Sequence, residues 1–166
     1  MKKYLLLLAI LFASCAEQKQ EPKTAGYSIR GEEESYMIGS DESIDFIKKW
    51  ADAHNERDME SILSMEKADI KIDLPDGTVI NGQDEHSKVL ESFFANNVTW
   101  KPYWILPYNS VKAQETWVIA GFALTSNVDG EKNLILHMGD IKLEDGLVSR
   151  IIVYENQRPK KGYPQR

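Results

Sequence analysis

The stretch that decides the fold runs from Ser40 to Gly82 and reads SDESIDFIKKWADAHNERDMESILSMEKADIKIDLPDGTVING. Its first part carries apolar and aromatic side chains at helical spacing, and these are Ile44, Ile47, Trp50, Ala51 and His54. The spacing predicts an amphipathic helix that begins at Ser40 or Asp41 and buries one face in a core. Asp58 is the expected N-cap of a second, shorter helix over 59–65.

The second part of the stretch has the period of a strand. Ile70, Ile72 and Leu74 alternate with charged residues, so one face of this strand is expected to be buried. Pro75-Asp76-Gly77 is typical of a turn, because glycine adopts the positive φ that most residues avoid. A short strand over 78–80 and a third helix from Gln83 to about Asn96 are expected to follow.

After the third helix, branched and aromatic residues predict β-structure. The expected strands are Trp100–Leu106, Ser110–Lys112, Glu115–Asn127, Asn133–Glu144 and Leu147–Asn156. Turn residues separate them, among them Pro107 and Asp145-Gly146. Helices followed by a run of antiparallel strands predict an α+β fold, with the helices packed on one face of a curved sheet. We therefore expect one domain over residues 40–157 and a disordered basic tail over 158–166.

The N-terminus has the order of a secretory signal. A basic start precedes an apolar run over 4–13, which is too short for a permanent membrane span. The run ends in small residues and Cys15, and it resembles the lipobox of bacterial lipoproteins, with Phe12 where a leucine is usual. We expect residues 1–14 to be removed and Cys15 to be acylated, which would anchor the protein to a lipid bilayer of the bacterial cell envelope. The alternative is an ordinary signal cleaved after Ala16.

The segment 15–39 is polar and is interrupted by proline and glycines. It has too few apolar residues to offset the cost of ordering the chain, so we expect a tether that begins at Cys15. A short strand or an added helical turn around 36–38 is the alternative reading of its last part.

Composition narrows the classes of partner. The 166 residues carry a net charge of −6, and the basic residues at both ends leave the body between them more acidic still. Such a body repels phosphate backbones, so nucleic acid is not an expected partner. Cys15 is the single cysteine, which excludes an intrachain disulfide and a thiolate metal cluster. We expect no cofactor.

Two segments together resemble a known family. The segment 56–85, ERDMESILSMEKADIKIDLPDGTVINGQDE, and the segment 138–156, MGDIKLEDGLVSRIIVYEN, resemble the SnoaL-like branch of the nuclear transport factor 2-like superfamily. The resemblance implies a cone, in which three helices wrap a strongly bent sheet around an apolar pocket, and it implies dimers formed through the outer face of the sheet. It does not imply a reaction, because the superfamily includes isomerases, cyclases, hydrolases, transport factors and members that only bind.

The ketosteroid isomerase pattern within that superfamily can be tested on this sequence. It needs a tyrosine and an acid that hold an oxyanion, and a second acid that moves a proton. The corresponding positions are Trp50, Gly139 and Leu74, and none supplies the required group. Asp73 and Asp140 lie one residue away, which turns a strand side chain to the opposite face. We therefore do not expect this chemistry.

Three histidines remain as candidates for proton transfer. His54 lies on the buried stripe of the first helix, His137 on the strand face expected to line the pocket, and His86 where the third helix turns inward. His137, with His54, is the candidate general acid and base. The alternative is that each is a buried or rim histidine bonded to backbone or water. Without HxH or HExxH spacing we predict no metal site, although a histidine pair with a carboxylate has suitable ligands.

The pocket and the interface follow from strand parity. The residues expected to line the pocket are Trp50, Leu74, Tyr103, Trp104, Phe122 and Tyr154, with plain core packing as the alternative for each. Trp117 and Ile119 have the opposite parity to Phe122 and would face outward. An exposed apolar patch there predicts a homodimer interface.

Three functions remain open on these grounds. The first is a membrane-anchored domain that binds a small, partly apolar ligand in its cone. The second is an isomerase, cyclase or hydrolase that uses His137, with His54, as general acid and base. The third is a structural or partner-binding domain with no open pocket.

Overall fold

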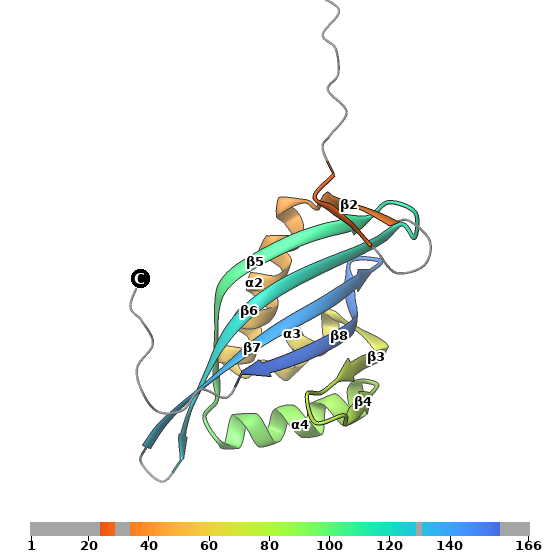
Figure 1. Ribbon diagram of the computed structural model, residues 1–166. Helices are drawn as coiled ribbons and strands as arrows, with labels where there is room; N and C mark the ends of the chain where they lie inside the picture. Colours follow the sequence, from red (N-terminus) through yellow and green to blue (C-terminus); the bar gives the residue numbers. More distant parts are fainter. Residues whose placement is uncertain (1–23, 29–33, 129–130, 157–166) are drawn as a thin grey trace, which may run out of the picture.

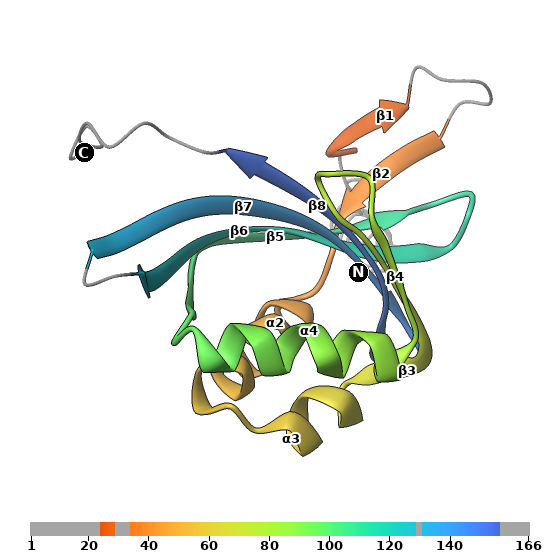
Figure 2. The same ribbon diagram turned by 90° about the horizontal axis from the view of Figure 1, so that it is seen from below.

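The computed structural model describes residues 24–28, 34–128 and 131–156. It contains one curved eight-stranded sheet with the strand order β1-β2-β5-β6-β7-β8-β3-β4. Figure 1 shows the long strands β5 to β8 side by side, and Figure 2 shows all three labelled helices on the inner side of their curve. The predicted α+β fold is confirmed. The expected signal, Cys15 and the tail 158–166 lie outside the described residues.

The helices are α2 (Asp41–Glu56), α3 (Met59–Ser64) and α4 (Gln83–Ala95). Ser40 is the N-cap of α2. The first turn carries acidic residues, whose negative charges interact favourably with the positive end of the helix dipole. Arg57, with φ near 60°, ends α2 in the left-handed conformation. The backbone N–H of Ser61 donates to the Asp58 carboxylate at 3.0 Å, so Asp58 caps α3 as predicted.

The described strands differ in detail from the predicted ones. They are β1 (Gly26–Ser28), β2 (Glu34–Ile38), β3 (Glu66–Asp73), β4 (Val79–Asn81), β5 (Thr99–Ser110), β6 (Glu115–Val128), β7 (Glu131–Glu144) and β8 (Leu147–Asn156). β5 continues through Pro107, where two separate strands were expected. Pro107 can remain in the ladder because its carbonyl accepts a hydrogen bond from the Gly39 N–H at 2.9 Å.

The sheet is mixed, which corrects the expectation of a wholly antiparallel one. β3 runs parallel to β8, with Ile72 opposite Ile151. Arg150 on β8 donates two hydrogen bonds to one Asp73 oxygen, at 3.0 and 2.7 Å. Alternation of apolar residues shows which face of a strand is buried, but it carries no information about the direction of the neighbouring strand.

The predicted tether is corrected where β1 and β2 form, and the alternative of a short strand around 36–38 is confirmed by β2. β2 pairs with the end of β5, with Tyr36 opposite Ser110, as Figure 1 shows. The Glu34 carboxylate accepts hydrogen bonds from the backbone N–H groups of Lys112 and Ala113. Backbone pairing along the free edge of β5 orders this segment, although its sequence buries little apolar area.

The core lies between the helices and the inner face of the sheet. Val118, Ala120, Phe122 and Leu124 of β6 are buried there against residues of α2 such as Ile47. The predicted parity of β6 is therefore confirmed. None of the helices in the described part of the chain has the length and apolar character of a membrane span.

Candidate functional site

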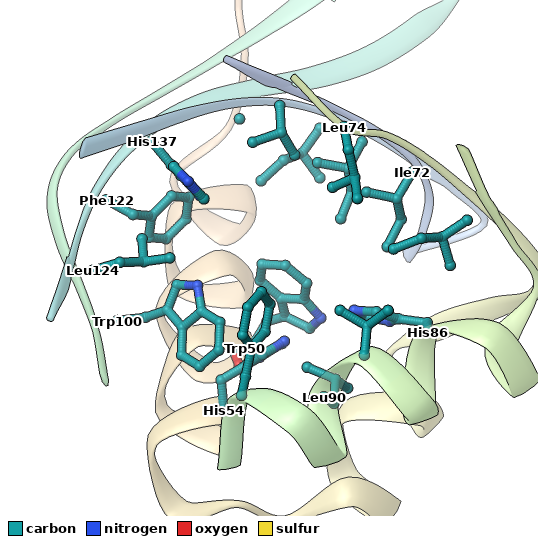
Figure 3. A pocket seen from close by; sticks show the side chains of 17 residues that line it. Trp50, His54, Ile72, Leu74, His86, Leu90, Trp100, Phe122, Leu124 and His137 are labelled. Atoms are coloured by element: carbon teal, nitrogen blue, oxygen red, sulfur yellow. The ribbon is translucent and has the colours of Figure 1, made fainter. Parts of the chain in front are cut away.

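An apolar pocket of about 90 Å³ opens between the helices and the inner face of the sheet. Figure 3 shows its lining. It is lined by Trp50, His54, Ile72, Leu74, Ile80, His86, Val89, Leu90, Phe93, Trp100, Phe122, Leu124, His137, Gly139, Ile141, Ile151 and Val153. The predicted pocket residues Trp50, Leu74 and Phe122 are among them, as are all three histidines. The domain therefore contains an open cavity. This observation does not support the third function considered above, a structural or partner-binding domain with no open pocket.

Three predicted pocket residues lie elsewhere. Tyr103, Trp104 and Tyr154 are 53%, 38% and 50% exposed and do not line the pocket. A bulge in β5 between Pro102 and Trp104 reverses the parity of the strand. Trp100, before the bulge, faces the pocket instead.

The outer position of Trp104 depends on Gly121. The two residues are paired across β5 and β6, and a side chain at position 121 would collide with the Trp104 indole and the Tyr103 ring. Tyr154 is on the same outer face because its neighbours Val153 and Glu155 pair with Gly139 and His137, which face inward.

A buried carboxylate, Glu66 of β3, lies behind the pocket residues Trp50 and His86. One of its oxygens accepts a hydrogen bond from the Trp50 indole at 2.9 Å, and the other accepts from His86 Nδ1 at 2.9 Å. The Glu66 side chain is 0% exposed. We did not predict Glu66 from the sequence, because glutamate is ordinarily a surface residue. Strand parity gave no signal either, because β3 has an irregularity between Glu66 and Lys71, and Ala68, which has the same parity as Ile70, is exposed.

His54 is buried beside this group. Its Nδ1–H donates to the Trp50 carbonyl at 2.7 Å, which leaves Nε2 as an acceptor. Burial lowers the pKa of His54 to about 4, helped by the nearby His86 and opposed by the Trp50 carbonyl and Glu66. The neutral ring is therefore a hydrogen-bond acceptor at neutral pH and a poor proton donor.

His137 approaches the pocket from the sheet. It stands opposite Phe122 on β6 and Glu155 on β8, and its Nε2 donates to the Glu155 carboxylate at 3.0 Å. Its side chain is 19% exposed. Figure 3 shows His137 on the side of the strands and His54 and His86 on the side of the helices.

The ketosteroid isomerase positions are in the pocket but lack the required groups. Trp50, Leu74 and Gly139 all line it. Asp73 pairs with Arg150, and Asp140 accepts a hydrogen bond from the Tyr108 hydroxyl at 3.1 Å. Neither carboxylate lines the pocket, as their strand parity predicted.

His54, Glu66 and His86 are also the described residues that could hold a metal ion. Each offers one ligand atom, and these atoms lie within 4.8 Å of one another. They come from α2, β3 and α4, so only folding brings them together.

Solved structures share this fold. A proposed ketosteroid isomerase from Kribbella flavida is 17% identical with a TM-score of 0.59, covering 78% of this chain and 86% of that chain. IdmH, a proposed polyketide cyclase from Streptomyces antibioticus, is 15% identical with a TM-score of 0.58, and the match covers 68% of this chain and 91% of IdmH. A nuclear transport factor 2-like protein of unknown function from Cytophaga hutchinsonii is 14% identical with a TM-score of 0.52. The match covers 69% of this chain and 89% of that chain.

These likenesses show the fold. The chain has the nuclear transport factor 2-like architecture, with the curved sheet and inner helices that the SnoaL-like resemblance implied. No family model matches the chain, and no curated protein sequence matches it. The activity must therefore be argued from the pocket itself.

Proposed function

We propose that the domain binds a small, largely apolar molecule in this pocket, with one polar atom of the ligand directed at the histidines on the helix side. The observation that supports the proposal is the combination of apolar walls with the buried, hydrogen-bonded pair His86–Glu66. The volume of about 90 Å³ limits the ligand to a few heavy atoms. An engineered cavity of about 150 Å³ takes benzene, so a five-membered ring is near the upper size limit for this smaller pocket. Small cyclic ketones and alcohols match this size and polarity.

Tryptophan fluorescence tests the proposal, because Trp50 and Trp100 both line the pocket. Titration of the full chain with cyclopentanone, cyclopentanol and cyclopentane should give a saturable change in emission, with the oxygen-bearing compounds binding more tightly. Gly139→Val should weaken binding about tenfold or more, since a side chain there fills space within the pocket.

Met138→Val is the matched control, because Met138 is on the same strand but is exposed. It should bind like the wild type. Absence of saturable binding by any of the three compounds, or equal binding by Gly139→Val, would contradict the proposal.

Proton transfer is a second candidate function. The observation that favours it is the presence of two imidazole–carboxylate pairs, His86–Glu66 on the helix side and His137–Glu155 on the sheet side. His54, whose pKa is lowered to about 4, is a weak base at neutral pH. Exchange of the α-hydrogens of cyclopentanone for deuterium, followed by NMR, measures this activity. It should fall in His86→Asn or His137→Asn, and an unchanged rate in both variants would exclude the idea.

We also propose that the domain is held on a membrane of the bacterial envelope through acylated Cys15. The support is the sequence pattern alone, a basic start and an apolar run that ends at a cysteine. Mass spectrometry of the mature N-terminus should find a lipid-modified Cys15, and Cys15→Ser should release the protein from membranes. A mature chain that begins at Glu17 would refute the anchor.

A further inference from the structure

We propose that His54, Glu66 and His86 bind a divalent transition-metal cation, such as Zn²⁺ or Fe²⁺, on the helix side of the pocket. The three side chains are buried and come from three elements, and their ligand atoms lie within 4.8 Å of one another. Two imidazoles and one carboxylate are a ligand set used by Zn²⁺ and Fe²⁺, with at least one coordination position left open.

Trp50 already orients two of the three ligands. Its backbone carbonyl accepts from His54 Nδ1, which leaves Nε2 of that ring for a cation. Its indole N–H donates to one oxygen of Glu66, which leaves the other oxygen beside His86. Metal-binding histidines and carboxylates are ordinarily held by such outer hydrogen bonds. Trp50 is therefore a positioning residue for the site.

The burial of Glu66 is a second argument. Its carboxylate is fully buried and accepts hydrogen bonds from the Trp50 indole and from His86 Nδ1. A carboxylate removed from water is unfavourable unless a positive charge lies nearby. A divalent cation between Glu66 and the two imidazoles supplies that charge. Coordination through Nδ1 requires the neutral His86 ring to carry its hydrogen on Nε2 instead of on Nδ1.

The inference deepens the proposed function and rests on it for the nature of the ligand. His54 and His86 both line the pocket, so the open coordination position faces the bound molecule. A cation there would take a carbonyl, hydroxyl or carboxylate oxygen as its further ligand. This site selects small apolar molecules that carry such an oxygen.

Titration of the metal-free full chain with Co²⁺ and Zn²⁺, without any organic compound, tests the site. One equivalent of Co²⁺ should bind and develop visible absorption bands, and Zn²⁺ should displace it. Glu66→Gln should weaken Co²⁺ binding at least 100-fold. Trp50→Phe should weaken it about 10-fold to 100-fold, because the indole hydrogen bond is lost while the three ligands remain.

His137→Asn is the matched control, because it removes the histidine that is outside the cluster. It should bind Co²⁺ like the wild type. Loss of binding in this variant would place the cation beside Glu155 and overturn the proposal, as would unchanged binding by Glu66→Gln.

A variant of a buried residue can fail to fold, so NMR of the Co²⁺-loaded wild type is the second measurement. Two histidine ring N–H signals shifted by the paramagnetic ion are expected, and one or none would overturn the site. The organic titration is separate from these measurements. If Co²⁺ binds as expected and no organic compound binds, the proposed function fails while the metal site stands.

Discussion

At the scale of single residues, His54 makes folding dependent on pH. Its pKa is lowered from 6.5 to about 4 in the folded protein, chiefly by burial. Above pH 6.5 the ring is neutral in both the folded and unfolded states. As the pH falls from 6.5 toward 4, the unfolded state takes up a proton that the folded state does not. The free energy of unfolding should therefore fall over this range, by about 3 kcal/mol for this residue.

Urea unfolding between pH 7.5 and 4 measures this contribution. His54→Asn removes the titrating ring, so its free energy of unfolding should decrease less than that of the wild type over the same range. Identical pH profiles for the wild type and His54→Asn would show that burial of His54 does not control the dependence.

At the scale of elements, the short helix α3 depends on its N-cap. Both the backbone N–H and the hydroxyl of Ser61 donate to the Asp58 carboxylate, at 3.0 and 2.6 Å. Asp58→Ala should lower the Tm by about 4 °C, because a helix of this length has few other stabilising contacts of its own. Asp58→Asn retains the accepting oxygen and should remain within about 1 °C of the wild type. Circular dichroism melts compare the three proteins, and equal loss in both variants would show that the cap is not the cause.

At the scale of the whole molecule, the outer face of the sheet is the surface for which we propose a homodimer. Trp104, Met138 and Tyr154 are exposed and lie in one cross-strand row that passes through Gly121. Trp117 and Ile119 are on the same face, as predicted, but are partly covered, so the apolar surface is centred farther along the strands. Such a row is a natural surface for a second copy.

Light scattering measures the assembly. The wild type should be a dimer. Met138→Glu should raise the dissociation constant of the dimer at least tenfold, because a charge would be buried at the centre of the contact. Trp117→Glu should have a smaller effect. Ser92→Glu adds the same charge at an exposed position of α4, away from the outer face of the sheet, and should leave the dimer intact. A monomeric wild type would contradict the proposed dimer interface.

Much of the fold could be read from local patterns. The spacing of Ile47, Trp50 and His54 predicted α2 and its buried face, and the parity of Phe122 predicted the inner face of β6. These predictions succeed because the period of an element and the side it buries are properties of a few consecutive residues. His54 and His137 were assigned to the pocket on the same grounds.

The remaining features depend on partners distant in the sequence. The bulge that exposes Trp104 exists where β5 pairs with β6, and the parallel pair of β3 and β8 joins segments with most of the domain between them. Glu66 became part of the candidate site because Trp50 and His86, from two helices, meet it in the folded protein. Sequence patterns therefore assign each side chain to a face, whereas the packing of distant elements selects its neighbours, and the chemistry of this pocket depends on those neighbours.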